Sequence, residues 1–165
     1  MHSIEDQLIL HEGLKTDLYK CPANKWTIGV GRNLEDRGLT ADEQQAILDE
    51  SGLTKEQVIE RLRSRGVSRE EALLLLRNDI KSIANALTLK YTWFTSLDEV
   101  RRKVCIDMAF NLGLGGFSKF KNMIRALAAK DYQKAAREME NSVWYRQVGD
   151  RAKRLVRMMR TGQDY

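Results

Sequence analysis

Glu12 is the first residue whose position in the chain suits acid–base chemistry. It ends a short amphipathic run that includes Leu8 and Ile9, and Gly13 follows it. Glycine at this place commonly closes a helix in a left-handed turn. A carboxylate in the last helical turn faces the negative end of the helix dipole, which disfavours its charged form. The sequence therefore predicts a carboxyl group that can donate a proton near neutral pH.

A predicted β-hairpin follows this helix and carries Cys21 and Thr27. Residues 22–25 supply turn chemistry, and the β-prone run that starts at Trp26 comes directly after them. We expect strands over 19–20 and 26–30. Because side chains alternate along a strand, Thr27 lies opposite the apolar residues of its strand and can face a groove.

Gly29 and Gly31 interrupt the second predicted strand. Glycine weakens a strand, and it is favoured where another backbone or a ligand must approach closely, or where the strand bulges or bends. A polysaccharide lying along the hairpin and a simple bulge both explain the two glycines.

Helical segments must position these residues, and several of them have recognisable N-terminal signals. Thr40 with Glu43 and Thr54 with Gln57 form two capping boxes, each opening a short peripheral helix. The charged residues between 42 and 65, Glu43 among them, fit a solvated surface. Residues 66–67 are expected to add a brief third strand.

A long helix is predicted over 68–90. Ser68 and Glu71 form its capping box, and apolar residues recur at helical spacing with no proline or glycine before Lys90. Beyond it the chain reads as helical to its end. The expected N-terminal caps of these helices are Ser96, Ser118 and Asp131. One helix is expected to stop at Gly113, with a turn over 112–116. The last helix is expected over 151–160, before Gly162.

Composition limits the classes of protein to consider. A chain of 165 residues with 42% apolar residues and one proline can form one ordered core, or two small lobes that share a helix. The net charge of +5 favours polyanionic partners, and bacterial cell wall and nucleic acid both qualify. A basic last helix could contact nucleic acid, but its apolar stripe favours packing, and the chain has no DNA-binding motif.

The cysteines and histidines indicate neither a disulfide framework nor a metal site. Cys21 and Cys105 lie far apart without paired spacing, and His2 and His11 have no clustered partners. We expect a reducing compartment, no metal and no cofactor. Cys105 and Trp144 are expected in the core. Residues 1–13 have no signal-peptide or membrane-span pattern, so we expect accumulation in the cytoplasm without stable membrane insertion, as a monomer.

The reactive residues also carry a resemblance to a known family. Glu12, Cys21 and Thr27 fit the pattern Glu, eight residues, Asp or Cys, five residues, Thr, which is that of phage-type lysozymes, glycoside hydrolase family 24. Further similar blocks appear in the family's order: EGL, LYK and TIGVG around the three residues, FNLG at 110–113, WY at 144–145, and RAKR and RTG within 151–162. The resemblance covers nearly the whole chain, except that residues 33–66 match poorly.

The resemblance implies an α+β fold, mainly helical and two-lobed, with a small antiparallel β-hairpin sheet and a long connecting helix. We expect a single domain over 1–165, with an N-terminal lobe over 13–67, the connecting helix over 68–90 and a helical lobe over 91–165. The helix over 3–12 would pack on the last of these lobes. The substrate would lie in the cleft between the lobes.

The resemblance further implies hydrolysis of the β-1,4 bond between N-acetylmuramic acid and N-acetylglucosamine in peptidoglycan, leading to host lysis. Glu12 would protonate the leaving oxygen, while Cys21 and Thr27 would position a water on the opposite face of the ring, as in an inverting glycosidase. The protein would need a separate membrane-permeabilising protein to reach the periplasm. The alternative is a wall-binding protein that keeps the cleft but has lost turnover.

Other positions follow from the same resemblance. T-even members of the family carry Asp where this chain has Cys21, and His where it has Arg32. A thiol is a poorer base than a carboxylate for orienting water. The implied supporting contacts pair Arg32 with Asp79 and place Arg151 beside Glu12. The implied sugar contacts are Asn33, Phe110 and Asn111.

Overall fold

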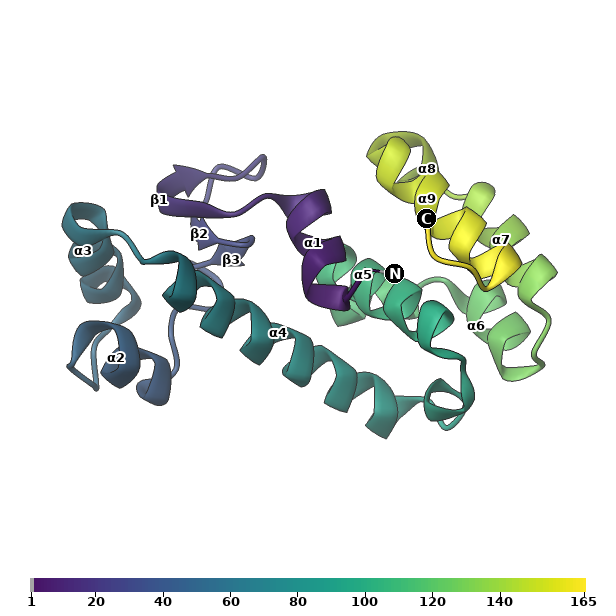
Figure 1. Cartoon of the computed structure of the whole chain (residues 1–165), viewed down its shortest axis with the longest axis horizontal. Helices are drawn as coiled ribbons and strands as arrows, with labels where there is room; N and C mark the ends of the chain where they lie inside the picture. Colours follow the sequence, from purple (N-terminus) through teal and green to yellow (C-terminus); the bar gives the residue numbers. More distant parts are fainter. Residues whose placement is uncertain (1) are drawn as a thin grey trace. The chain divides into compact units, whose positions relative to one another are not determined.

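The computed structural model describes residues 2–165 and shows the expected α+β class, mainly helical with one small antiparallel sheet (Figure 1). By contact density the chain divides into two compact units, one of Leu8–Asp79 and one that joins the first residues, up to Gln7, to Ile80–Tyr165. The elements are α1 (Ile4–Glu12), β1 (Lys15–Lys20), β2 (Trp26–Gly29), β3 (Arg32–Asn33), α2 (Ala41–Leu48), α3 (Lys55–Arg65), α4 (Arg69–Lys90), η1 (Phe94–Ser96), α5 (Glu99–Ser118), α6 (Lys121–Ala128), α7 (Tyr132–Glu140), α8 (Val143–Val148) and α9 (Asp150–Thr161).

The predicted hairpin is present in the Leu8–Asp79 unit. β1 pairs antiparallel with β2, and Tyr19 lies opposite Thr27. β1 begins earlier than expected, because Lys15 also pairs with Gly29 across an irregularity in the register. β2 in turn pairs with β3, so the strand order is β1-β2-β3.

The third strand was predicted in the wrong place. It is formed by Arg32–Asn33, whereas Val67 only donates one backbone hydrogen bond, of 2.8 Å, to the carbonyl of Thr16. Gly66 explains the difference, because its N–H still closes the last turn of α3 on the carbonyl of Leu62. A segment that begins as a helix cap has too few free backbone groups left to extend the sheet.

α2 and α3 have the predicted capping boxes at Thr40 and Thr54. In each, the threonine hydroxyl accepts from the backbone N–H three residues on, and the side chain at that position accepts from the threonine N–H. The two helices, the sheet and the start of α4 enclose a small apolar core whose buried members are Ile28, Leu34, Leu39, Ile47, Val58, Ile59, Leu62, Val67, Ala72 and Leu75.

α4 is the predicted long helix, with 22 residues and the Ser68–Glu71 capping box. It contributes its residues up to Asp79 to one unit and those from Ile80 to the other. Since no residue within it is glycine or proline, nothing in the sequence interrupts its backbone hydrogen bonds.

The second unit has its own core, built mainly from α5, α6, α7 and α9. Asp131 caps α7 and Gly162 ends α9 in a left-handed turn, both as predicted. The cap of α5 is Asp98 instead of Ser96, because Ser96 belongs to the short 3₁₀ helix that precedes it. The expected Ser118 cap is also wrong, since α6 starts at Lys121 and its N-cap residue, Phe120, makes no side-chain cap.

Gly113 interrupts α5, as expected, with a φ of 76° and a ψ of 162°. The residues after it return to helix as far as Ser118, so the turn expected over 112–116 is a kink between two helical segments. Phe110 and Asn111 thus end the first of these segments. Among the helices that the structure describes, none is both long enough and apolar enough to cross a membrane.

Candidate active site

Glu12 is the last residue of α1, and Gly13 ends the helix as predicted. Gly13 has a φ of 79°, and its N–H donates to the carbonyl of Ile9 over 2.8 Å. Glycine adopts this left-handed conformation without steric cost. Glu12 therefore ends the part of α1, from Leu8 onward, that belongs to the same unit as the hairpin, and the residue is half-buried.

Cys21 starts the hairpin turn, which we call the Cys21 turn (residues 21–25). The carbonyl of Cys21 accepts from the N–H of Asn24 over 2.8 Å, and its own N–H donates to the carbonyl of Lys25 over 3.0 Å. Asn24 takes a left-handed conformation with a φ of 61°, which asparagine tolerates better than most residues. The turn leaves the Cys21 side chain half-exposed.

The same turn lowers the pKa of the Cys21 thiol. The largest cause is the backbone N–H of Lys25, which donates to the sulfur and outweighs the opposing effect of partial burial. The Thr27 hydroxyl and the N–H of Ala23 act in the same direction. Hydrogen bonds to the charged form favour it, so the turn favours a thiolate at a lower pH than an ordinary cysteine needs.

Thr27 lies on β2 opposite Tyr19, and its expected place facing a groove stays a prediction. Its side chain is buried, and its hydroxyl donates to the carbonyl of Lys25 over 2.9 Å. A hydroxyl has one proton to donate. When Cys21 is a neutral thiol this proton goes to Lys25, and a thiolate at Cys21 competes for it.

Tyr19 also lies at the candidate active site, and sequence reasoning missed it. Burial raises the pKa of its phenol, the negative charge of Glu12 raises it further, and a Cys21 thiolate adds to this, while the N–H of Gly31 lowers it by donating to the phenol oxygen. These electrostatic effects require Glu12, Cys21 and Tyr19 to be neighbours. The available signal was the alternation of β1, which puts Tyr19 two residues before Cys21.

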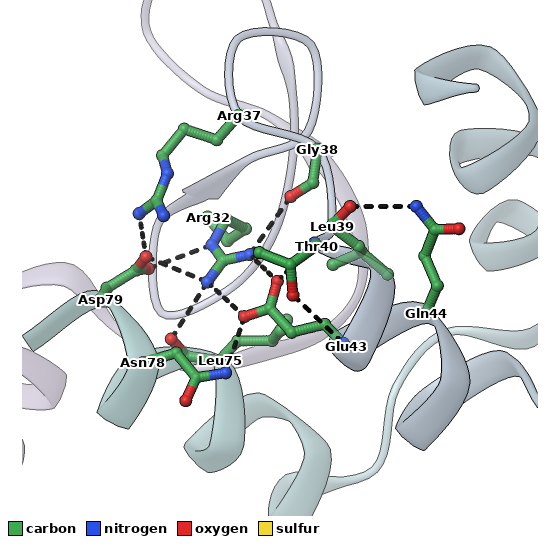
Figure 2. A network of polar contacts seen from close by, with 10 residues as sticks. All are labelled: Arg32, Arg37, Gly38, Leu39, Thr40, Glu43, Gln44, Leu75, Asn78 and Asp79. Carbon is green, nitrogen blue, oxygen red and sulfur yellow. Dashed lines mark hydrogen bonds and ion pairs between the residues drawn. The ribbon is translucent and has the colours of Figure 1, made fainter. Parts of the chain in front are cut away.

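Arg32 and Asp79 form the predicted ion pair, which Figure 2 shows as part of a larger network. The Arg32 Nε donates to one carboxylate oxygen over 3.1 Å and Nη2 donates to the other over 2.9 Å. Arg32 is 2% exposed and Asp79 is 3% exposed. The pair is bidentate, the geometry in which a guanidinium binds a carboxylate most specifically.

Glu43 completes this network, although we expected it on a solvated surface. It is 1% exposed, and its carboxylate accepts from Arg32 Nη1 over 2.7 Å and from Nη2 over 2.9 Å. We call Arg32, Glu43 and Asp79 the Arg32 cluster. The sequence signal for the position of Glu43 was the capping box, which fixes this residue in the first turn of α2. The carboxylate oxygen of Glu43 that accepts from the Thr40 N–H also accepts from Arg32.

The remaining donors of the cluster are also satisfied. Arg32 donates to the carbonyls of Gly38 and Leu75, each over 3.2 Å, and Asn78 donates to Glu43 over 2.8 Å (Figure 2). Burial opposes the ionisation of Glu43, but the hydrogen bonds from Arg32, Asn78 and Thr40 outweigh it and lower its pKa to about 2. A charged carboxylate can therefore stay buried here.

Arg151 lies on α9 in the other unit and is anchored there by Asp107 of α5. Its Nε donates to a carboxylate oxygen of Asp107 over 2.8 Å. The second oxygen of Asp107, which is fully buried, accepts from the Gln7 amide over 2.8 Å. The Arg151 guanidinium is thus held in a fixed orientation by a buried carboxylate, whose own position is fixed by α1.

The predicted sugar contacts fall in both units. Asn33, on β3, uses its amide locally: its oxygen accepts from the N–H groups of Glu35 and Asp36, and its nitrogen donates to the Asp36 carboxylate. Asn111 accepts from the Trp144 indole over 2.8 Å, and Phe110 beside it is half-buried. These contacts fix the Asn33 and Asn111 side chains; the sugar-binding roles of all three residues stay predictions.

Trp144 and Cys105 lie in the core, as the sequence indicated. Trp144 packs edge-on against Phe120, with ring centroids 5.9 Å apart. Cys105 is fully buried, and burial raises the pKa of its thiol. Among residues 2–165, no three His, Cys, Asp or Glu side chains gather as a metal site would require.

Similarity to known proteins extends over nearly the whole chain. A model of the phage lysozyme family matches residues 10–161. Two proteins of Dictyostelium discoideum are similar along almost their whole length: "Probable T4-type lysozyme 2" is 32% identical and "Probable T4-type lysozyme 1" is 29% identical, each alignment covering 97% of this chain and 95% of the relative. The pre-baseplate central spike protein Gp5 of Enterobacteria phage T4 is 32% identical over 87 residues, which cover 53% of this chain and 14% of that protein.

Proposed function

The chain belongs to the phage lysozyme family, and from that premise we propose that it is a muramidase with a working active site. As a lysozyme it acts on peptidoglycan. The bond that we propose it hydrolyses is the β-1,4 linkage between N-acetylmuramic acid and N-acetylglucosamine.

Glu12 is the proposed general acid. It transfers its proton to the glycosidic oxygen as the bond to the anomeric carbon breaks, and the departing sugar leaves as a neutral alcohol. A water molecule attacks the same carbon from the opposite face. The water proton passes to the Cys21 thiolate, or to solvent when Cys21 is neutral and only orients the water. The proposed outcome is inversion at the anomeric carbon.

The observation that carries this proposal is the arrangement around Tyr19. The charges of Glu12 and Cys21 both act on its phenol, and Thr27 lies directly opposite it in the sheet. The three residues of the family pattern therefore gather around one side chain. The Cys21 turn supports a role for the sulfur, because its N–H groups favour the thiolate that could accept a proton.

The activity is tested with purified peptidoglycan and with permeabilised Gram-negative cells. We expect the parent protein to release reducing sugars and clear the suspension, and the first product detected by NMR to have the α configuration. Glu12→Gln should lose activity by about a hundredfold or more, because general-acid help is worth about 10² to 10⁴ in rate. Asp6→Asn, which changes an exposed acid on the same helix, is the matched control.

Three results would change the proposal. Clearing by Glu12→Gln at more than a few per cent of the parent rate would remove Glu12 as the acid. A first product in the β configuration would replace inversion by retention. Tight wall binding without reducing-sugar release, in both the parent and Cys21→Asp, would favour the alternative of a non-catalytic wall-binding protein.

The biological role that we propose is lysis of the host cell by a monomer that accumulates in the cytoplasm and reaches the wall through a separate membrane-permeabilising protein. The two cysteines are unlinked, which fits a reducing compartment. Expression in a bacterial host should leave the cells intact until a membrane-permeabilising agent is added. Lysis without that agent would contradict the route, and size-exclusion chromatography tests the monomer.

A further inference from the structure

The hairpin carries three lysines, and they differ in whether a nearby carboxylate pairs with their positive charge. The Lys25 ammonium lies 2.5 Å from an Asp36 carboxylate oxygen, and the Lys20 ammonium lies 3.9 Å from a Glu35 carboxylate oxygen. Lys15 is exposed and, within residues 2–165, has no carboxylate at ion-pair distance. Its positive charge is therefore available to an external anion without the loss of an existing ion pair.

Lys15 nevertheless has a defined place. Its ammonium lies 4.4 Å from the centroid of the Tyr19 ring, at the distance of a cation–π contact. Its backbone is fixed by the pairing with Gly29. A lysine side chain is flexible, so a contact of this kind reduces the number of conformations that it must give up on binding a ligand.

Tyr19 links this cation to the candidate active site. Its ring lies under the Lys15 ammonium, its backbone lies opposite Thr27, and the charges of Glu12 and Cys21 act on its phenol. The Lys15 charge is thus held at one side of the group of residues that we assign to hydrolysis, outside the set that does the chemistry.

We propose that Lys15, held over the Tyr19 ring, is a specificity-determining residue that binds a carboxylate of the stem peptides carried by the glycan strands. This inference rests on the proposed function, since it names the part of peptidoglycan that the same site recognises. Neutral glycans such as chitin oligosaccharides lack that carboxylate. Lys15 therefore favours peptide-bearing strands over peptide-free neutral ones.

The test combines a change in the protein with a change in the substrate. Lys15→Met keeps an unbranched side chain over the ring and removes the charge, and Lys20→Met removes an equal charge that is already paired on the same hairpin. Each is assayed on native peptidoglycan and on peptidoglycan whose carboxylates have been amidated with a carbodiimide and ammonia.

We expect Lys15→Met to lower kcat/KM on native walls by about two- to fivefold, the range of an exposed ion pair. The loss should appear in KM with kcat unchanged, because the contact is the same in the ground and transition states. It should shrink at high salt and be absent on amidated walls. Lys15→Arg should keep the parent value, and Lys20→Met should have little effect.

Co-sedimentation with walls separates this inference from the proposed hydrolysis. It is measured in the Glu12→Gln background, where the walls are expected to remain undigested, with and without Lys15→Met. Weaker binding to native walls alone supports the Lys15 contact even if the protein proves inactive. The inference is overturned if Lys15→Met changes binding equally on native and amidated walls, if Lys20→Met has the same effect, or if neither variant changes binding.

Discussion

The Arg32 cluster and the Cys21 turn belong to the same unit but treat their ionisable groups in opposite ways. In the cluster every charge is buried, and Arg32, Glu43 and Asp79 satisfy one another with short, multiple hydrogen bonds. In the turn the Cys21 thiol is half-exposed, and backbone N–H groups and one hydroxyl set its ionisation. The first arrangement lowers the pKa of Glu43 far below neutral pH, and the second leaves a half-exposed thiol able to change its protonation state. This is the difference expected between a cluster that holds a fold and the site that we propose reacts.

The largest effect on stability should follow removal of Arg32. Arg32→Met leaves two buried carboxylates without their main partner, and removing one member of a buried ion pair costs about 3–5 kcal/mol. For a chain of this size that lowers the melting temperature by roughly 10 °C. The matched control is Arg63→Met, because Arg63 pairs with Glu60 at an exposed position. A cost for Arg32→Met no greater than for Arg63→Met would show that the buried network contributes little.

A double-mutant cycle tests whether the predicted partners act together. We expect the unfolding free energies of Arg32→Ala, Asp79→Ala and the double variant to be non-additive at neutral pH, because each single variant already breaks the same buried pair, while Glu43 loses Arg32 in the Arg32→Ala and the double variant alike. Purely additive losses would mean that the two residues are not coupled. Activity per folded molecule is the control, since the cluster lies outside the set of residues that we assign to hydrolysis.

Acid should weaken the cluster through Glu43. The folded-state pKa of this residue, about 2, lies below its ordinary value of 4.5. Its ionisation therefore stabilises the fold above about pH 4.5, and the contribution, about 3 kcal/mol, is lost as the pH falls toward 2. Urea unfolding between pH 6 and pH 2.5 should show a weaker pH dependence in Glu43→Gln. The exposed pair member Glu50, changed to Gln, should leave the parent dependence nearly intact.

The lowered pKa of the Cys21 thiol should be measurable as chemical reactivity. Iodoacetamide reacts with thiolates, so alkylation of Cys21 should reach half its maximal rate at a pH below that of an ordinary cysteine, while the buried Cys105 reacts far more slowly. Thr27→Val removes one donor and should move the midpoint upward. Mass spectrometry of the two cysteine peptides across pH 6–9 measures both effects. Equal reactivity of the two cysteines would contradict the assigned environments.

Substitutions of Cys21 test the part of the sulfur in the proposed mechanism. Cys21→Asp should be at least as active as the parent, because a carboxylate orients water better than a thiol. Cys21→Ala should lose most of the activity, and alkylation should inactivate the parent unless a chitooligosaccharide is bound. If Cys21→Ala keeps full activity, the sulfur has no part in the reaction. Glu12 and Thr27 would then remain to carry it.

Local sequence signals predicted what depends on neighbours in the chain. The hairpin, the helix that ends at Gly13 and the capping boxes at Thr40, Thr54 and Ser68 were all predicted, because turn residues and caps act over a few positions. The errors have local causes too. Ser96 and Gly66 carry suitable signals, but the 3₁₀ helix and the last turn of α3 had already used their backbone groups.

Burial of polar groups was the part that the sequence could not supply. The Arg32–Asp79 pair was expected only through family resemblance, and Glu43 looked like one more charge in a polar segment. Its place in the cluster depends on how α2 packs against β3 and α4, which no local pattern encodes. Tyr19 was missed for a similar reason, since its significance comes from facing Glu12, Cys21 and the Gly31 N–H at once.

Arg37 should give the smallest stability effect, and it provides the closest comparison with Arg32, because both guanidiniums bind the Asp79 carboxylate. The Arg37 side chain is 47% exposed, whereas that of Arg32 is 1% exposed. Water and salt screen an exposed pair, so Arg37→Ala should cost less than about 1 kcal/mol at low salt and still less in 1 M NaCl. The loss caused by Arg32→Met should hardly depend on salt. Urea unfolding of both variants at the two salt concentrations makes the comparison. Similar costs would mean that the charge of Asp79 decides the strength of these contacts, and that neither burial nor the larger number of hydrogen bonds made by Arg32 does.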